Sequence, residues 1–194
     1  MHLEYIDRAS YRKKYEPELI KRWKNKLGDF YLIPEGGSNR LAVKGCAEII
    51  QSINTNFDFI CSACGTGGTL AGLILGLNKS AFALGFSVLK NGGFLNQNIK
   101  SFLKYFDAED FKNWQINLDY HFGGYAKVTM ELIEFCNNFS KKHNIPIEPI
   151  YTGKMFYGLY DLINQNYFPA NSTIVAIHTG GLQGLDGLKF RKKL

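Results

Sequence analysis

The sequence has few of the features that mark secreted, membrane-bound or metal-binding proteins. Its four cysteines, Cys46, Cys61, Cys64 and Cys136, form no disulfide pattern for a chain of 194 residues. Cys61 and Cys64 form a CxxC pair, but no histidine has the spacing of a second zinc-ligand pair, so we interpret them as small residues at a strand end. No apolar run approaches the length of a membrane span, and the first 26 residues are too charged for a signal peptide. We therefore expect a cytoplasmic protein with no membrane partner and no metal.

The net charge of +6 comes largely from two basic segments, residues 8–26 and 189–193. In the first segment Leu19, Trp23 and Leu27 recur at helical spacing with basic residues between them. This pattern is typical of an amphipathic surface helix with a solvated basic face. A nucleic-acid surface would instead interleave basic and aromatic side chains on one face. We therefore expect no nucleic-acid partner.

Hydrophobic periodicity predicts alternating helices and strands along the chain. The helices are expected at residues 11–27 (ending near Gly28), 41–50, after residue 69, and at 94–106, 127–143 and 155–164; the strands are expected at residues 30–33, around 57–60, and at 81–89, 114–118 and 173–177. Such alternation favours an α/β protein with a mainly parallel sheet. In sheets of this type, ligands bind at the carboxyl ends of the strands, where this sequence has glycine-bearing polar loops.

The stretch from Cys64 to Gly72 reads as a strand end, a glycine turn and the start of a helix. Glycines at 65, 67 and 68 let a ligand approach the backbone, and the following helix directs unpaired N–H groups at the turn, which suits a phosphate. The alternative is a tight connection without a ligand. Leu70 stands where a dinucleotide motif needs its last glycine, and no Gly-Lys-Ser/Thr completes a P-loop. What remains is a cradle suited to a single phosphomonoester.

Four motifs occur together in a recognisable order. They are Ile33-Pro-Glu-Gly-Gly-Ser-Asn39, Cys64-Gly-Thr-Gly-Gly-Thr69, Tyr151-Thr-Gly-Lys154 with Tyr157-Gly158, and Ile177-His-Thr-Gly-Gly181. Together they resemble the pyridoxal-phosphate enzymes of the 1-aminocyclopropane-1-carboxylate deaminase and D-cysteine desulfhydrase family. The resemblance covers nearly the whole chain from about Tyr5. It implies the fold-type-II, tryptophan-synthase-β-like architecture, a three-layer αβα arrangement with residues 1–55 in a smaller domain and 56–194 in a larger cofactor-binding domain.

The resemblance also implies roles for individual residues. Pyridoxal 5'-phosphate is the expected cofactor, with its phosphate held by Gly65, Thr66, Gly67, Gly68 and Thr69. Thr179 matches the residue that meets the pyridine nitrogen, and Tyr151 matches a tyrosine lying against the ring. The turn of Gly36, Gly37 and Ser38 and the loop of Tyr125 are expected to face a small amino-acid substrate, and Tyr151 and Tyr125 are the candidate catalytic residues. The alternative for both tyrosines is a half-buried structural aromatic, and His178 is expected to be a strand-end residue.

The sequence departs from the family pattern at several positions. Thr152 and Thr179 stand where cyclopropane deaminases have glutamate and leucine, which points toward the desulfhydrase side of the family. Neither Lys44 nor Lys154 stands in the family's lysine motif, and the family's Ser-Asn-His segment is not found. We therefore expect a chain that lacks the amino-terminal part of the enzyme and is poorly active alone. Its exposed apolar surface should favour association, with a homodimer as the candidate assembly. The alternative is a non-catalytic module that binds the cofactor or phosphate.

Overall fold

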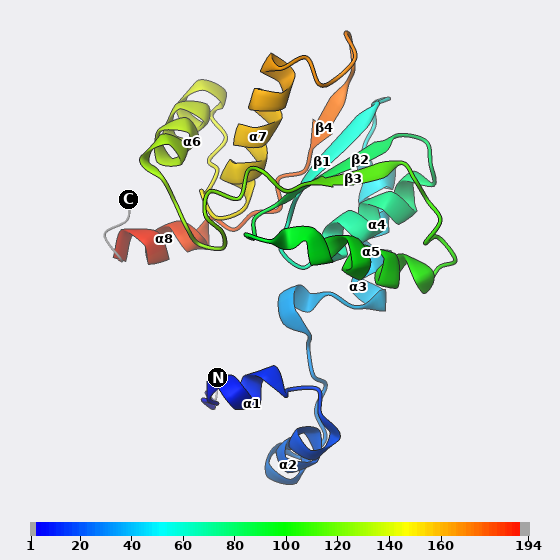
Figure 1. Cartoon of the computed structure of the whole chain (residues 1–194), viewed down its shortest axis with the longest axis vertical. Helices are drawn as coiled ribbons and strands as arrows, with labels where there is room; N and C mark the ends of the chain where they lie inside the picture. Colours follow the sequence, from blue (N-terminus) through cyan, green and yellow to red (C-terminus); the bar gives the residue numbers. More distant parts are fainter. Residues whose placement is uncertain (1–2, 191–194) are drawn as a thin grey trace. The chain divides into compact units, whose positions relative to one another are not determined.

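The computed structural model describes residues 3–190, which fall into two compact units, Met1–Ile33 and Pro34–Leu194 (Figure 1). No helix in the described part of the chain is long and apolar enough to cross a membrane. The assignment of residues 1–55 and 56–194 to a smaller and a larger domain stays a prediction. The basic residues 191–193 of the tail lie outside the described residues.

The first unit contains two helices, α1 (Arg8–Arg12) and α2 (Pro17–Leu27). The prediction of one helix over residues 11–27 is therefore wrong, because the helix breaks before Pro17. Proline has no N–H to donate within a helix but is well suited to the first position of a new one. Gly28 ends α2 with a φ of 76°, as predicted. The strand predicted at residues 30–33 is also wrong, since these residues form no ladder and Tyr31 and Ile33 are exposed.

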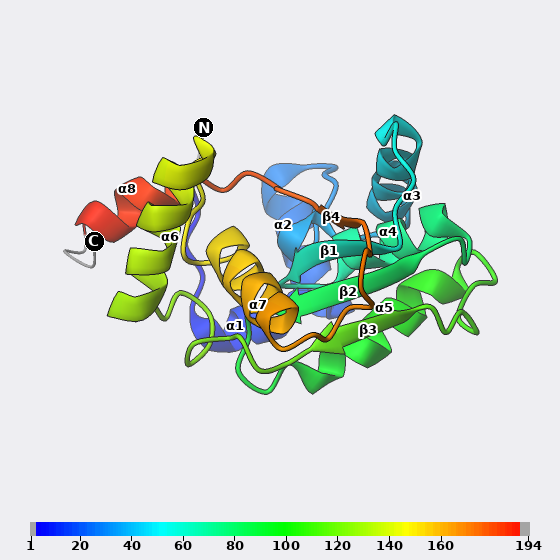
Figure 2. The ribbon, with the colours of Figure 1, turned by 90° about the horizontal axis from the view of Figure 1, so that it is seen from above.

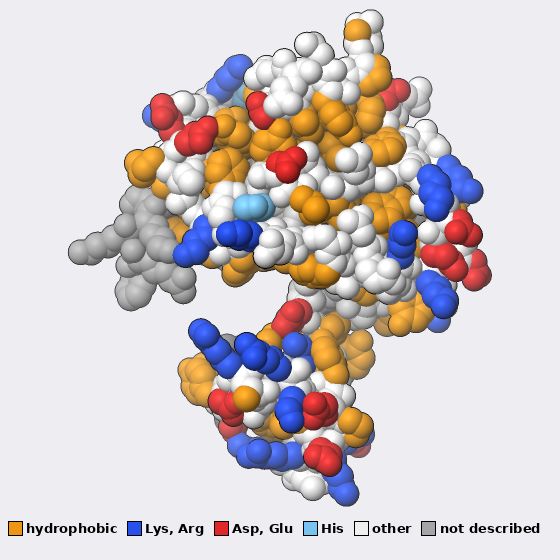
Figure 3. Space-filling model, viewed as in Figure 1, with side chains coloured by type: hydrophobic (Ala, Val, Ile, Leu, Met, Phe, Trp, Pro, Cys, Tyr) orange, Lys and Arg blue, Asp and Glu red, His pale blue; other side chains and the backbone are white. Residues whose placement is uncertain are grey.

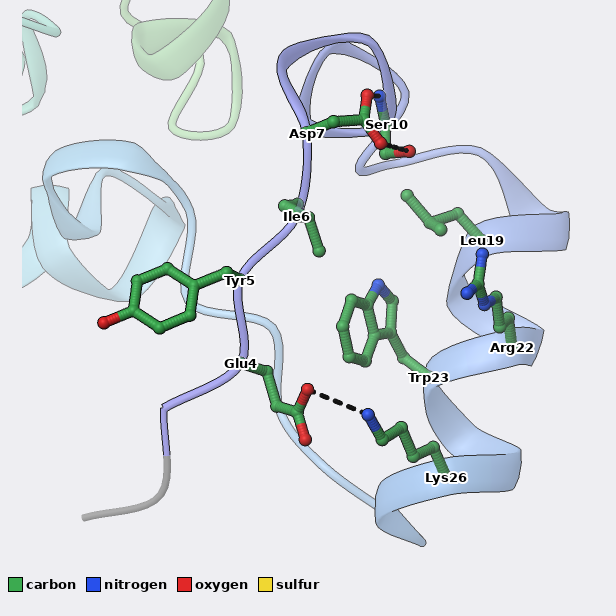
Figure 4. A pocket seen from close by; sticks show the side chains of 9 residues that line it. All are labelled: Glu4, Tyr5, Ile6, Asp7, Ser10, Leu19, Arg22, Trp23 and Lys26. Atoms are coloured by element: carbon green, nitrogen blue, oxygen red, sulfur yellow. Dashed lines mark hydrogen bonds and ion pairs between the residues drawn. The ribbon is translucent and has the colours of Figure 1, made fainter.

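A small cavity of about 160 Å³ lies within this first unit (Figure 4). Its lining combines the apolar side of α2 with the extended segment before α1, and consists of Glu4, Tyr5, Ile6, Asp7, Ser10, Leu19, Arg22, Trp23 and Lys26. Lys26 closes one side through an ion pair of 2.8 Å with Glu4. Acidic side chains lie among the basic ones on this unit (Figure 3). That mixture agrees with a solvated helix face, and the absence of a nucleic-acid partner stays a prediction.

The second unit is built on a four-stranded sheet of order β3-β2-β1-β4 in which every neighbouring pair is parallel. The strands are β1 (Phe59–Cys64), β2 (Phe82–Ser87), β3 (Trp114–Asn117) and β4 (Ile174–Ala176). All four overlap the predicted strands: β2, β3 and β4 have slightly shorter bounds, whereas β1 begins two residues later than predicted and extends to Cys64. The parallel α/β architecture predicted from the sequence is therefore confirmed.

Helices cover both faces of this sheet and make a three-layer unit (Figure 2). On one face lie α3 (Arg40–Ala47), α4 (Gly68–Leu77) and α5 (Leu95–Lys104), and on the other lie α6 (Met130–His143) and α7 (Thr152–Asn164). Strand residues alternate between two cores: Ile60 packs with the first set of helices and Cys61 with the second. This alternation follows from the two-residue period of a strand.

Short elements complete the unit and correct several predicted bounds. They are the 3₁₀ helices η1 (Glu35–Gly37), η2 (Glu48–Ser52) and η3 (Gly92–Phe94), and the terminal helix α8 (Gln183–Phe190), which was not predicted. Asn39 caps α3 by accepting a hydrogen bond from the Ala42 N–H at its side-chain oxygen. Helix α6 begins after the capping residue Thr129 rather than at Lys127, and α7 begins at Thr152 rather than Met155.

Candidate functional site

The loop between β1 and α4 leads into a helix N-terminus that no side chain caps. Gly67 adopts a left-handed φ of 89°, and α4 starts at Gly68 without any side-chain cap. A Cβ on Gly67 would lie 2.9 Å from the Cγ1 atom of Ile99, so only glycine fits this close turn. The first-turn N–H groups and the positive end of the helix dipole are thus available to an anion.

The turn of Gly36, Gly37 and Ser38 packs against this loop. The Ser38 Oγ and Thr66 Oγ1 atoms lie 2.5 Å apart and share a hydrogen bond. A Cβ on Gly36 would lie 2.8 Å from Thr66 Oγ1, and one on Gly68 would lie 2.5 Å from Ser38 Oγ. The predicted substrate-facing turn and the predicted phosphate loop are therefore in direct contact, which the sequence did not indicate.

Tyr151 lies on the other side of the same loop. A Cβ on Gly65 would lie 3.2 Å from Tyr151 Cε1, so the missing side chain makes room for this ring. The Tyr125 ring meets the Tyr151 ring edge-on, with centroids 5.8 Å apart and an interplanar angle of 66°. Burial, the neighbouring Tyr125 phenol and the charge of Glu148 raise the pKa of Tyr151 well above its ordinary value. At neutral pH Tyr151 is a protonated phenol, which can donate a hydrogen bond but is a poor base.

Glu148 orients Tyr151 and was missed by the sequence reasoning. Its buried carboxylate accepts hydrogen bonds from the backbone N–H groups of Ile150 (2.6 Å), Tyr151 (3.0 and 3.1 Å) and Thr152 (2.7 Å). The Thr152 hydroxyl adds a further bond at 3.1 Å. A carboxylate is well placed at a helix N-terminus, where it satisfies unpaired N–H groups and complements the dipole. An acidic residue shortly before a predicted helix was the available signal.

The loop after β4 reaches the same carboxylate. A Cβ on Gly181 would lie 3.4 Å from the Cγ atom of Glu148, and Thr179 is exposed two residues earlier. His178 receives a bond of 3.0 Å from the Gly180 N–H at Nδ1, so its Nε2 carries the proton and donates to the Pro146 carbonyl at 2.8 Å. His178 thus supports the loop through two hydrogen bonds, in keeping with a strand-end role.

Lys154 is fully buried and its ammonium is already engaged. Its Nζ donates to the carbonyl oxygens of His121 at 2.9 Å and Gly124 at 2.7 Å. Burial lowers the pKa of Lys154 to about 8, against an opposing effect of Glu148. Among the lysines whose burial the structure describes, it is the one that is buried.

The cysteine pair lies inside the sheet rather than at a metal site. Cys61 and Cys64 are both buried in β1, and burial raises the pKa of each thiol to about 12. Within residues 3–190, no group of three or more His, Cys, Asp or Glu side chains could hold a metal ion. The interpretation of these cysteines as small strand residues agrees with their packing.

The described residues fit the phosphate and ring ends of pyridoxal phosphate. The uncapped α4 N-terminus offers N–H groups to a phosphate, and the Ser38–Thr66 hydroxyl pair lies beside it. Gly65 lies directly before these N–H groups and is packed against the Tyr151 ring, so a phosphate and an aromatic ring could be bound side by side. The glycines carry no side chains that would block the cradle.

Comparison with known proteins identifies the family. The family model for "Pyridoxal-phosphate dependent enzyme" matches residues 8–180. A Pyrococcus furiosus protein provisionally named 1-aminocyclopropane-1-carboxylate deaminase is 36% identical over 187 residues, covering 88% of this chain and 56% of the relative. The mitochondrial bifunctional D-cysteine desulfhydrase/1-aminocyclopropane-1-carboxylate deaminase of Arabidopsis thaliana is 33% identical, covering 80% of this chain and 42% of the relative.

Solved structures agree with the sequence comparison. The crystal structure of an ACC deaminase homologue superimposes with a TM-score of 0.78 at 30% identity, covering 98% of this chain and 62% of that one. A cystathionine β-synthase from Helicobacter pylori, at 19% identity and a TM-score of 0.53, shares the fold alone. The chain spans just over half the length of the Pyrococcus furiosus relative. It belongs to the family of pyridoxal-phosphate dependent enzymes, with the tryptophan-synthase-β-like fold and pyridoxal phosphate as the family's cofactor.

Proposed function

We propose that this chain binds pyridoxal phosphate at the loop of residues 65–69 and serves the deamination of a small amino acid, with release of ammonia and a 2-oxo acid and, where the substrate is D-cysteine, of hydrogen sulfide as well. The observation that carries the proposal is the contact of Gly65 with Tyr151, which joins an anion-binding helix end to an aromatic ring. An isolated phosphate site has no need of this aromatic neighbour, whereas a phosphorylated pyridine ring does.

Each part of the site would have a separate task. The N–H groups of residues 65–69 and the hydroxyls of Thr66 and Thr69 hold the phosphate, and the Thr179 hydroxyl meets the pyridine nitrogen. When bound, pyridoxal phosphate supplies an electron sink for a carbanion at the substrate. A neutral hydroxyl partner leaves the ring nitrogen unprotonated, which makes that sink weaker than an acidic partner would. The hydroxyl groups of Tyr151 and Tyr125 donate hydrogen bonds that orient the substrate, while Gly36, Gly37 and Ser38 border the substrate.

The surroundings of Thr152 favour a D-cysteine-like substrate over the cyclopropane amino acid. The Thr152 hydroxyl donates to Glu148 and its side chain is buried, so it offers nothing to a substrate. This is the position at which the resemblance places a glutamate in cyclopropane deaminases. Loss of that acidic group removes a proton acceptor or donor from the substrate side. We therefore expect D-cysteine to be the better of the two substrates.

The second candidate function is a binding module without turnover. It is favoured by one observation, the engagement of the buried Lys154 ammonium by two carbonyl oxygens. A lysine held in this way cannot attack a carbonyl group of the cofactor. The two functions share the phosphate site and differ in covalent chemistry.

One experiment separates these functions. The purified chain is mixed with pyridoxal phosphate, reduced with borohydride, and searched by mass spectrometry for a lysine that carries the reduced cofactor. Ammonia release from D-cysteine and from 1-aminocyclopropane-1-carboxylate is measured in parallel. A single labelled lysine other than Lys154 with ammonia release supports the enzyme, and binding that inorganic phosphate competes away without label or ammonia supports the module. If the chain does not bind pyridoxal phosphate at all, both the enzyme and the binding module are refuted. Gly36→Ala is the variant expected to weaken binding of the cofactor. Light scattering on the same sample measures the molar mass in solution and so tests the expectation that the chain forms a homodimer.

A further inference from the structure

We propose that the ammonium of Lys154 acts as an internal cation that fixes the turn of residues 121–124 and thereby holds Tyr125 against Tyr151. Lys154 is in this view a positioning residue. The proposal rests on the proposed function in one respect only, that Tyr125 faces the substrate.

The burial of Lys154 needs a physical explanation. Its side chain has 0% exposure and is among the largest fully buried side chains of the molecule. Removing an ammonium from water is costly unless polar groups replace the water. Here the replacement comes from the carbonyl oxygens of His121 at 2.9 Å and Gly124 at 2.7 Å, which belong to one turn. The two hydrogen bonds that offset the cost of burying the ammonium are therefore the same ones that hold this turn.

The backbone of residues 121–126 contains several left-handed φ values. Phe122 and Ala126 have left-handed φ values of 52°, which are uncommon for residues with a Cβ. Gly123 and Gly124 between them have φ values of 89° and 116°. The carbonyls of His121 and Gly124 each accept one backbone bond, from the N–H groups of Gly124 at 2.9 Å and Lys127 at 3.1 Å. The ammonium is the second donor to both carbonyls and links the turn to α7.

The same turn of α7 positions both partners of the tyrosine pair. Tyr151 is the N-cap residue of α7, and Lys154 lies three residues later, in the first turn of the helix. Tyr125 directly follows Gly124, whose carbonyl Lys154 holds. Tyr125 has 57% of its surface accessible, so the contact with Tyr151 alone fixes its ring only in part, and the backbone clamp helps to keep the two rings together. A disturbed clamp should therefore release Tyr125 and leave Tyr151 in place.

Amide hydrogen exchange tests the clamp on the full chain without cofactor. In Lys154→Met, which keeps the length of the side chain but donates no hydrogen bond, exchange at Gly124 and Lys127 should accelerate about tenfold or more relative to the unmodified protein. Amides of β1 should keep their rates. The matched control is Lys142→Met, which removes an exposed lysine of α6. Unchanged exchange at Gly124 and Lys127, or an equal acceleration throughout the unit, overturns the proposal.

Chemical rescue provides a second variant, in case Lys154→Met does not fold. Lys154→Ala leaves space for a small cation beside the two carbonyls. Methylammonium chloride should restore protection at Gly124 and Lys127 in Lys154→Ala, or its folded circular dichroism spectrum if folding is lost. Tetramethylammonium chloride at equal ionic strength donates no hydrogen bond and should restore neither. Absence of any rescue by methylammonium contradicts the role of Lys154 as a cation.

Turnover measurements then separate this inference from the proposed function. If the unmodified chain shows no cofactor binding, the proposed function fails, and hydrogen exchange still decides the role of Lys154. If it turns over, Lys154→Met and Tyr125→Phe should each raise KM for the amino acid, and the double variant should be no worse than the poorer single one. Fully multiplicative effects in the double variant contradict a role of Lys154 through Tyr125.

Discussion

Replacing Glu148 by glutamine tests how Tyr151 is positioned. The Glu148 side chain is 1% exposed, and its two oxygens serve the N–H groups of Ile150, Tyr151 and Thr152. Glutamine has nearly the same shape but offers one oxygen and one NH₂ group. Whichever way the amide turns, its NH₂ group faces at least one backbone N–H group, so a donor meets a donor.

The structure sets the size of the effect. If the NH₂ group takes the place of Oε2, the bond of 2.6 Å to Ile150 is lost; in the place of Oε1, the bond of 2.7 Å to Thr152 is lost. A hydrogen bond to a charged group contributes roughly 1.5–3 kcal/mol, and a buried donor without an acceptor costs about 1–3 kcal/mol. The two ranges are alternative estimates of one lost interaction and are not added together. We therefore expect the free energy of unfolding to fall by about 2–3 kcal/mol. For a chain of this size that lowers Tm by roughly 4–12 °C.

The assay is urea unfolding of Glu148→Gln beside the unmodified chain, followed by circular dichroism. Glu134→Gln, at an exposed position of α6, is the matched control and should change stability by no more than about 0.5 kcal/mol. Affinity for pyridoxal phosphate is measured on the same samples, because a loosened Tyr151 should also weaken binding. A loss no larger than that of Glu134→Gln would refute the assignment of Glu148 as the residue that holds this helix end.

Three further outcomes are expected. Gly36→Ala should weaken cofactor affinity more than Gly37→Ala, because both glycines have left-handed φ values, 62° and 66°, but only a Cβ at Gly36 meets Thr66; equal losses in a spectroscopic titration contradict the contact. Native alkylation at pH 8 should modify the partly exposed Cys46 first, because burial raises the pKa of Cys61, Cys64 and Cys136 to about 12, and early mass-spectrometric labelling at Cys61 or Cys64 disproves this order. The pKa of Lys154 is lowered by burial from its ordinary 10.5 to about 8, so between these pH values the unfolded chain binds more protons at Lys154 and stability gains with rising pH. In urea unfolding, the free energy of unfolding of the unmodified chain minus that of Lys154→Met should therefore increase from pH 8 toward pH 10. If this difference does not change with pH, the lowered pKa of Lys154 is contradicted.

Local signals in the sequence were enough for the architecture and for the uncapped helix N-terminus after β1. A strand period of two residues, interrupted by glycine turns, predicted all four strands of the sheet. The glycines at 65, 67 and 68 predicted an open helix end, since their effect on the backbone depends on neighbouring residues alone. Local signals failed where the apolar pattern of residues 11–27 masked the break before Pro17, and where residues 30–33 read as a strand without a partner strand beside them.

The sequence by itself determined the parallel α/β class, the glycine turn before α4 and the family, because these depend on short motifs. Only the tertiary structure decided how the motifs meet. The Ser38–Thr66 bond joins residues 28 positions apart, and the bonds of Lys154 to His121 and Gly124 span 33 and 30 positions. No periodicity encodes such contacts, since they join segments that only the packing of the helices and loops around the sheet brings together. For the same reason a lysine that looks like an ordinary helix residue in the sequence proves to be a buried cation beside the candidate site.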